Sequence, residues 1–252
     1  MSRREDPYRI AWVLAAVGVV VVLVLSLLVL VGVRWWGGSG ECRVTVGERT
    51  VELSSDDAET ASTVAARAVR LRFSAARAER AVARVLDGSD DEVRLVTAAL
   101  TGRAPRALTC RHGGAEDTEP DRLDRVGLTH RAVVARRDLQ RAFGPQKLGG
   151  YAPGGVRSGH MVGSAHYEGR AIDVFFRPIT RQNRVRGWAM AQYLVANAER
   201  LELNTVIYDG RIWTARRSFQ GWRTYRVNHS GRSAATVAIL EHRDHVHVDV
   251  AD

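Results

Sequence analysis

The sequence contains very little cysteine and almost no lysine. Cys42 and Cys110 are the only cysteines among 252 residues, which excludes a disulfide-dense miniprotein and a zinc finger with four thiolate ligands. Lys147 is the only lysine, so arginine supplies nearly all of the 37 basic residues. This preference is most simply a mark of a GC-rich genome. Wholesale disorder and fibrous structure are also excluded, because 45% of the residues are hydrophobic and 26% are charged, as in ordinary globular proteins.

The formal net charge of +9 indicates an anionic neighbour, which lipid headgroups, a wall polymer or a nucleic acid would supply. The sequence has neither a recognition-helix signature nor an aromatic-rich basic sheet, so we expect no nucleic-acid partner. Arginines are frequent between Arg67 and Arg84. That pattern favours a solvated helix face over a surface that holds an anion.

A long uncharged run near the amino terminus decides the expected compartment. Residues 10–33 form 24 residues without a charge, and as a helix they would extend about 36 Å, enough for a hydrocarbon core of about 30 Å. A cleaved signal peptide is the alternative, but its apolar stretch is usually about 7–15 residues and ends in small residues. Here the run ends in Arg34-Trp35-Trp36, which is typical of a membrane interface. The sequence therefore predicts an uncleaved transmembrane anchor.

The arginines around this run predict its orientation. Arg3, Arg4 and Arg9 precede the run, whereas Arg34 stands alone beyond it until Arg43. The positive-inside rule then gives a cytoplasmic tail over residues 1–9, a single span in the cell membrane over 10–33, and an extracellular remainder.

An exported domain can keep a disulfide. Because Cys42 and Cys110 both follow the anchor, we expect them to pair, although two free cysteines remain an alternative. On the chain-entropy estimate such a bridge stabilises the fold by about 4 kcal/mol.

Residues 41–110 are expected to form a small, mostly helical region. Alternating apolar residues around Gly47-Glu48 predict a short hairpin. Ser54, with Asp57 three residues on, is typical of a helix start, and the helical pattern continues to about Leu86. A second helix is expected over residues 91–100. The sequence does not decide whether this region packs on the rest of the chain or stands apart as a spacer.

Residues 111–126 are polar, contain Gly and Pro, and predict a linker before a domain over 127–252. Thr129 is expected to cap a helix, and a glycine-rich stretch over 148–169 precedes an apolar strand, where functional sites often lie. Helix and strand alternate without regular βαβ repeats, so the predicted fold class is α+β. The remaining expected elements are a strand over 171–176, a helix over about 184–203, and strands over 205–208, 211–214 and 244–250.

Three residues form a candidate metal-binding set, namely His166, Asp173 and His247. Zinc accepts imidazole nitrogen and carboxylate oxygen, and a catalytic zinc site keeps three protein ligands. A glycine turn between His166 and Asp173 lets their side chains converge. His245, His247 and Asp249 share one face of the last predicted strand, so the two histidines should point into one pocket. Asp249 is then a candidate to orient a ligand, or a solvated carboxylate.

The segment Ser164–Asp173 resembles a known zinc signature, S-x-H-x-x-G-x-A-x-D, at all five fixed positions. This signature is found in D-alanyl-D-alanine carboxypeptidases and related dipeptidases, which share the Hedgehog-like metallopeptidase fold with murein endopeptidases. The resemblance covers about half of the chain, residues 127–252, and extends to the carboxy-terminal domains of exported or membrane-anchored actinobacterial proteins. It implies a bound zinc ion, with His247 as the third ligand.

The resemblance also implies a general base close to the last ligand. The family often has a glutamate three residues before that ligand, and Asp244 stands there in this chain. Murein endopeptidases use a histidine two residues before it, which corresponds to His245, and the spacing of His242, His245 and His247 resembles that branch. Asp244 and His245 are therefore both candidates for the catalytic base.

Substrate-binding residues are expected in the glycine-rich stretch. The dipeptidase-type Tyr-Arg-Pro is Tyr151-Ala152-Pro153 here, so the arginine that holds a substrate carboxylate is missing. Arg157 is the candidate replacement, and Tyr151 and Ser164 complete the expected substrate-binding set. His160 is either a further substrate contact or a loop histidine.

The sequence thus predicts an extracellular zinc peptidase that hydrolyses peptide bonds in peptidoglycan, as a carboxypeptidase or an endopeptidase. The alternative is a non-catalytic, zinc-stabilised module that binds cell-wall peptides. Which peptide bond is cut and the oligomeric state do not follow from the residues.

Overall fold

The structure is a computed structural model that describes residues 41–116 and 122–252. The expected tail over 1–9 and the expected anchor over 10–33 lie outside these residues. Within the described part of the chain, no helix combines the length and the apolar character that a membrane crossing requires.

A three-stranded antiparallel sheet opens the described chain, in the order β2-β1-β3. The expected hairpin is confirmed as β1 (Cys42–Val46) and β2 (Arg49–Leu53). The third strand, β3 (Leu108–Cys110), was not expected, because it pairs with β1 from far along the chain. Its register places Cys42 directly opposite Cys110. The predicted disulfide between them is confirmed.

Three helices follow the hairpin: α2 (Ser55–Arg70), α3 (Ala75–Val82) and α4 (Asp90–Leu100). Ser54 caps α2 as expected, since its side chain accepts a hydrogen bond from the backbone N–H of Asp57 at 3.1 Å. The expectation of one helix to Leu86 is wrong. The chain turns at Arg72, whose φ is +53°, and the Phe73 N–H bonds back to the Ala68 carbonyl at 2.9 Å. This is a Schellman termination with arginine where glycine is usual.

The six-stranded sheet has the order β4-β5-β9-β6-β7-β8, and each pair of neighbouring strands in it is antiparallel. Mixed helix and sheet confirm the α+β class.

Two helix expectations need correction. Thr129 is the N-cap residue of α5, but its side chain makes no cap hydrogen bond. The helix expected to reach residue 203 ends at Ala196, since Asn197 is its C-cap and donates a side-chain hydrogen bond to the Tyr193 carbonyl at 2.8 Å, and Leu203 begins a strand. The elements are α5 (His130–Phe143), β4 (Leu148–Gly149), β5 (Ala171–Phe175), α6 (Arg181–Ala196), β6 (Leu203–Tyr208), β7 (Arg211–Thr214), the 3-10 helix η1 (Ala215–Gln220), β8 (Arg223–Thr224), α7 (Ala234–Leu240) and β9 (His245–Val250).

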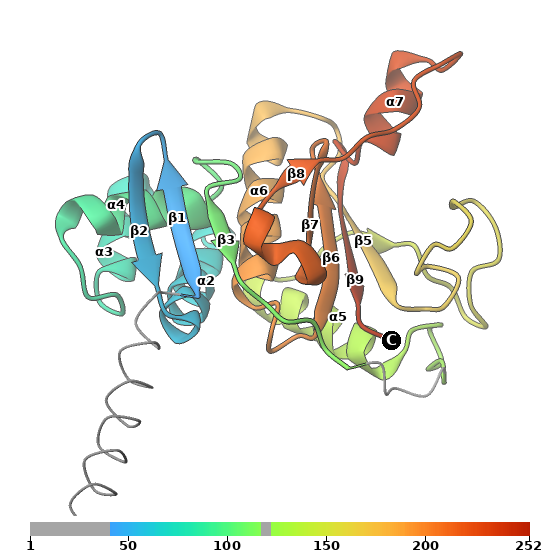
Figure 1. Ribbon diagram of the computed structural model, residues 1–252, viewed down its shortest axis with the longest axis horizontal. Coiled ribbons are helices and arrows are strands. Elements are labelled where there is room, and N and C mark those ends of the chain that lie inside the picture. The colour runs from blue at the N-terminus through green and yellow to red at the C-terminus, as the bar shows by residue number, and fades with distance from the viewer. Residues whose placement is uncertain (1–40, 117–121) are drawn as a thin grey trace, which may run out of the picture. The chain divides into compact units, whose positions relative to one another are not determined.

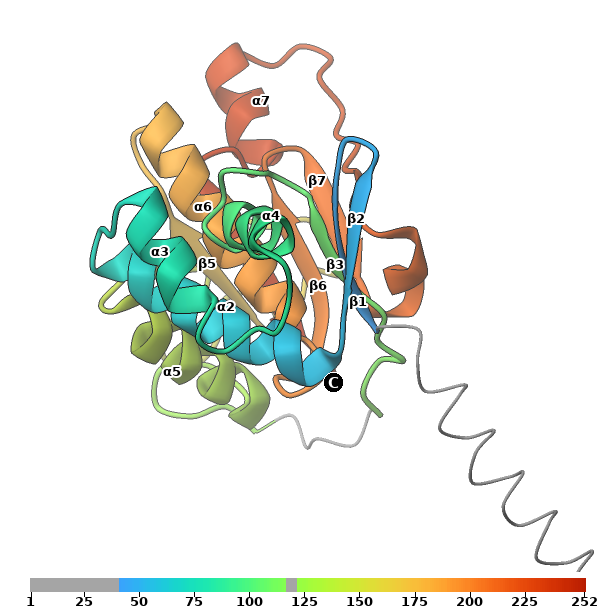
Figure 2. The ribbon, with the colours of Figure 1, turned by 90° about the vertical axis from the view of Figure 1, so that its left-hand side faces the viewer.

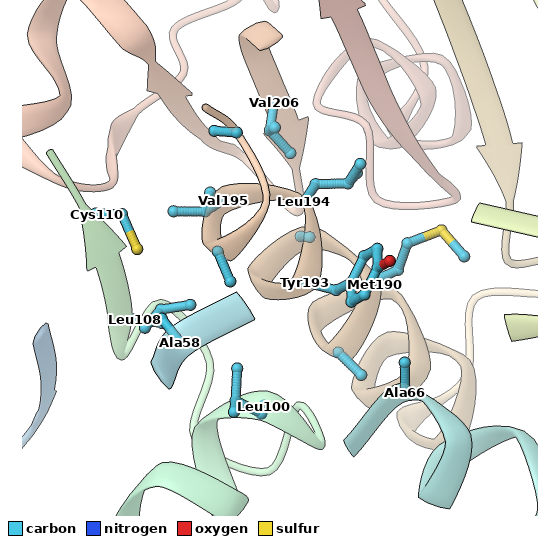
Figure 3. Close-up of a cluster of buried hydrophobic side chains, with 14 of the residues drawn as sticks. Ala58, Ala66, Leu100, Leu108, Cys110, Met190, Tyr193, Leu194, Val195 and Val206 are labelled. Carbon is cyan, nitrogen blue, oxygen red and sulfur yellow. The ribbon is translucent and has the colours of Figure 1, made fainter. Parts of the chain in front are cut away.

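Helix α6 lies between the six-stranded sheet and the region over 41–110 (Figure 1). In the view turned by 90°, α2, α3 and α4 lie in front of the large sheet (Figure 2). The region over 41–110 therefore packs on the rest of the chain and is not a separate spacer, and 41–252 forms one compact unit. One continuous core runs through it, and side chains of α6 such as Met190 and Leu194 lie between those of α2 and β6 (Figure 3).

Strand β9 has two different faces, although all of it is buried. Val246, Val248 and Val250 belong to the hydrophobic core, to which α5 and α6 also contribute. The intervening His245, His247 and Asp249 must point to the opposite face, because side chains alternate along a strand. The sheet thus places its polar residues on the side away from the helices.

Candidate metal centre

The three predicted ligands meet on the polar face of the six-stranded sheet. Asp173 lies on β5 and is the direct cross-strand partner of His247 on β9. His166 lies in the loop before β5, where the turn ending at Gly169 folds it back over the sheet. The three residues form a candidate metal-binding group and are only 3%, 6% and 7% exposed, for His166, Asp173 and His247 respectively.

The candidate ligand atoms form a nearly equilateral triangle, which we call the ligand triangle. His166 Nε2 lies 3.1 Å from His247 Nδ1 and 3.3 Å from Asp173 Oδ1. The third side, from His247 Nδ1 to Asp173 Oδ1, is 3.2 Å. A tetrahedral zinc ion with bonds of about 2.0–2.1 Å keeps its ligand atoms about 3.3–3.4 Å apart. The triangle therefore fits such an ion without movement of the backbone.

Hydrogen bonds behind the triangle fix which imidazole nitrogen faces inward. His166 Nδ1 donates to the Gly150 carbonyl oxygen at 2.8 Å. His247 Nε2 donates to Asp249 Oδ2 at 3.2 Å, so Asp249 takes the orienting place that the sequence suggested for it. With both protons directed outward, two nitrogen lone pairs and one carboxylate oxygen converge. Such carboxylate- or carbonyl-bound histidines are common at metal sites.

The electrostatics of the triangle favour a positive charge at its centre. Burial would raise the pKa of Asp173, but the contacts with His166 and His247 outweigh burial and lower that pKa far below its usual range. Burial would lower the pKa of His247, but Asp173 and Asp249 raise it to about 9. A proton on His247 can supply the charge, and a bound metal ion must displace that proton.

Gly150 makes the close approach of His166 possible. Its φ is +83°, and a Cβ atom there would lie 2.3 Å from Cε1 and 2.5 Å from Nδ1 of His166. Only glycine leaves room for the imidazole and its hydrogen bond to the backbone. The sequence placed this glycine in the glycine-rich stretch over 148–169 but did not indicate its role.

The two candidate bases occupy different positions. His245 Nε2 lies 3.8 Å from Asp173 Oδ1, beside the ligand triangle. Asp244 points away from the triangle: its Oδ1 accepts a hydrogen bond from His245 Nδ1 at 2.7 Å, and its Oδ2 accepts one from Arg177 Nε at 2.6 Å. Burial would raise the pKa of Asp244, but hydrogen bonds from His245 and Arg177 lower it, so the carboxylate stays ionised.

Further rings enclose this arrangement. The His160 ring stacks on His166 with centroids 4.0 Å apart, and His242 packs against His245 at 4.5 Å. Burial and the neighbouring histidines His245 and His247 lower the pKa of His242 to about 3, so this ring is neutral at ordinary pH. Arg177, which sequence reasoning missed, also covers the Phe175 ring at 4.3 Å. The only sequence feature that indicated a role for Arg177 was its position at the end of a predicted strand.

The three residues expected to bind substrate do not all lie at the ligand triangle. Ser164 Oγ accepts a 3.4 Å hydrogen bond from the backbone N–H of His166, so it lies at the site. Tyr151 packs against the hydrophobic core and faces the Arg136 guanidinium at 5.9 Å. Arg157 is exposed and has no ion pair or side-chain hydrogen bond within 41–116 and 122–252. The structure thus brings Ser164 to the ligands and does not tie Arg157 to them.

Comparison with known proteins adds one finding. A family model described as VldE, C-terminal domain, matches residues 125–237, which is less than half of the chain. The match includes His166 and Asp173 and stops before His247. No curated protein and no solved structure matches the chain.

Proposed function

We propose that this chain is a zinc-dependent peptidase that hydrolyses peptide bonds of cell-wall peptidoglycan, with a domain of the Hedgehog-like metallopeptidase type. The observation that carries the proposal is the ligand triangle, with His245 beside it. A His/Asp/His set of three is the ligand number of catalytic zinc sites. The signature around His166 and Asp173 supports peptidoglycan peptides as the substrate class.

The chemistry that a bound zinc ion supplies is polarisation of the scissile carbonyl and acidification of the attacking water. The protein's own residues manage the proton. His245 accepts it at Nε2 and passes it to the leaving amine, as a general base and then a general acid. Asp244 accepts the hydrogen bond from His245 Nδ1 and stabilises the imidazolium. Arg177 holds Asp244 in place from the other side.

The proposed location rests on the uncharged run over residues 10–33 and on the arginines that flank it. We place residues 1–9 in the cytoplasm, 10–33 in the lipid bilayer and 41–252 outside the cell. The disulfide between Cys42 and Cys110 supports this location, because such bonds persist in oxidising compartments.

One observation favours a second candidate function, a non-catalytic module that binds cell-wall peptides. His245 Nε2 is close enough to the triangle to act as a fourth ligand after a small shift. Four protein ligands would close the site and make the metal purely structural.

The experiment measures bound zinc and muropeptide hydrolysis for the full-length protein and three variants. His166→Ala should lose both zinc and hydrolysis. His245→Ala should keep stoichiometric zinc and lose hydrolysis by about 100-fold or more, the size of a general-base contribution. His130→Ala changes an exposed histidine at the start of α5 and should match the wild type.

The two functions give different results for His245→Ala. Loss of zinc from this variant, together with a wild type that leaves muropeptides uncut, would establish the binding module. Hydrolysis that survives His166→Ala would exclude the proposed mechanism.

A further inference from the structure

A second concave site lies within the helical layers, away from the ligand triangle. It is a groove of about 420 Å³ between the end of α2, the starts of α3 and α6, and the end of α5. Four arginines line it: Arg70, Arg72, Arg103 and Arg186. Its apolar floor includes the half-buried Val69 and Val185; Phe73 and Phe143 also line it, and no carboxylate does. We call it the arginine groove.

Most of the positive charge in the arginine groove is not neutralised by the protein. Arg70, Arg72 and Arg186 have no ion pair among the described residues. Arg103 has one long ion pair, with Glu79 at 3.6 Å, and its Nε donates a hydrogen bond to the neutral Thr101 Oγ1 at 3.1 Å. Arg70 also donates one hydrogen bond, to the Arg141 carbonyl at 3.2 Å, which leaves its charge intact. Like charges held together around one cavity favour an anionic ligand.

Two helix starts add to this potential. Ala75 is the first residue of α3, and Gln182 lies in the first turn of α6, and both line the groove. The amino-terminal end of a helix carries a partial positive charge. The groove therefore combines guanidinium groups, helix starts and an apolar floor.

We propose that the arginine groove binds an anionic polymer in which phosphodiesters alternate with small polyol units. The guanidinium groups pair with the phosphates, and the floor at Val69 and Val185 contacts the carbon spacers. A bilayer is a poorer fit, since the groove is concave.

The aromatic residues of the groove do not offer a platform for nucleic-acid bases. The Arg77 guanidinium covers the Phe73 ring at 3.9 Å from its centroid, and Phe143 is buried and packs edge-on against Tyr193. Single-stranded nucleic acids are bound largely by stacking of bases on exposed rings. The recognised chemistry is therefore the phosphodiester chain.

The test measures binding of a synthetic glycerol-phosphate oligomer to the full-length protein in nonionic detergent, by calorimetry at low salt. The triple variant Arg70→Gln, Arg72→Gln, Arg186→Gln should bind about tenfold or more weakly, because three phosphate contacts are lost. The corresponding lysine variant keeps the charge and should retain most of the binding. Because the lysine variant is changed at the same three positions, it also controls for disruption of the fold by substitution there.

A matched control removes the same charge elsewhere. Arg84, Arg216 and Arg232 are exposed and have no ion pair among the described residues, and their triple glutamine variant should bind like the wild type. Equal weakening in both triple variants would reduce the effect to net charge and overturn the proposal. So would an absence of binding by the wild type. Phosphatidylglycerol added to the micelles should not compete, and competition would assign the groove to a lipid headgroup instead.

Discussion

Gly150 controls the geometry of the ligand triangle without contributing a ligand atom. Replacement by alanine would force the His166 ring away, since the new Cβ would lie 2.3 Å from Cε1. Gly150→Ala should therefore weaken zinc binding by about 10–100-fold, the usual effect of disturbing a ligand's supporting contact. Zinc affinity measured by competition with a chelator checks this.

Gly154 provides the control for this substitution. It also has a positive φ, +78°, but nothing lies within 4 Å of the position of its Cβ. Gly154→Ala suffers the same backbone strain without the collision and should keep its zinc affinity. Equal losses in the two variants would mean that loop strain, and not the contact with His166, sets the affinity.

Asp138 is a second residue whose effect can be isolated. It is 5% exposed on α5, and it accepts hydrogen bonds from Tyr193 at 2.6 Å and Arg200 at 3.0 Å. Burial would raise its pKa, but the hydrogen bonds from Arg200 and Tyr193 lower it. A carboxyl whose pKa is lowered on folding contributes stability above its unfolded pKa of about 3.9 and loses that contribution as the pH falls through its folded pKa.

The prediction is a pH-dependent difference between the wild type and Asp138→Asn. At pH 7 the variant should be less stable by about 2 kcal/mol, the size of hydrogen bonds to a charged group. Below about pH 4 the gap should narrow, because Asp138 then takes up a proton in the unfolded chain while the native carboxylate, with its lowered pKa, is still ionised. Urea unfolding at both pH values provides the measurement. A gap that stays constant with pH would show that the charge of Asp138 contributes nothing.

At the scale of elements, a buried glutamine joins α6 to the region over 41–110. Gln192 is fully buried; it accepts a hydrogen bond from the Leu108 N–H at 2.8 Å and donates to the Ala99 carbonyl at 2.6 Å. Gln192→Met keeps the volume but leaves the Leu108 N–H without this partner, whereas the Ala99 carbonyl keeps its hydrogen bond from the Gly102 N–H at 2.8 Å. The free energy of unfolding should fall by about 1–3 kcal/mol, the cost of one unpaired buried group.

Chemical denaturation compares this variant with Gln140→Met, an exposed substitution on α5. The control should change stability by less than about 0.5 kcal/mol. If Gln192→Met were equally harmless, the packing of α6 on β3 and α4 would rest on apolar contacts alone.

The elements that sequence reasoning identified were those with local signals. The hairpin around Gly47-Glu48 and the cap at Ser54 depend on neighbours within a few residues. The end of α2 was missed because Arg72 takes a conformation that usually marks glycine. Strand β3 was missed because three residues carry no periodicity and pair with β1 only in the folded protein.

The candidate site shows the same division. His166, Asp173 and His247 were found because a motif and an alternating strand place them. Gly150 and Arg177 act through contacts with residues distant in the sequence, and no local pattern distinguishes them from neighbours of the same type. His160 was recognised as a candidate contact, but only the structure shows its stack on His166.

At the scale of the whole molecule, the disulfide closes the region over 41–110. It joins the first strand to the last one of the small sheet, across 68 positions of the sequence. Removing it with Cys42→Ser and Cys110→Ser should lower the free energy of unfolding by about 4 kcal/mol on the chain-entropy model. Urea denaturation measures the loss.

A reducing agent should produce a similar loss in the wild type and none in the double variant. A wild type that is unaffected by complete reduction, confirmed by thiol counting, would contradict the prediction. It would show that β3 stays paired with β1 through backbone hydrogen bonds and packing alone.

The direct pairing of Asp173 with His247 has a further consequence for sequence change. Deleting a single residue within β9 would advance its tail by one step, and valine would then face Asp173 while imidazole and carboxylate groups turned toward α5 and α6. Burying these polar side chains in the hydrophobic core would destabilise the fold, and the ligand triangle would lose His247. The buried valines of β9 therefore fix which of its residues face Asp173. Substitutions within β9 should disturb this register less than insertions or deletions.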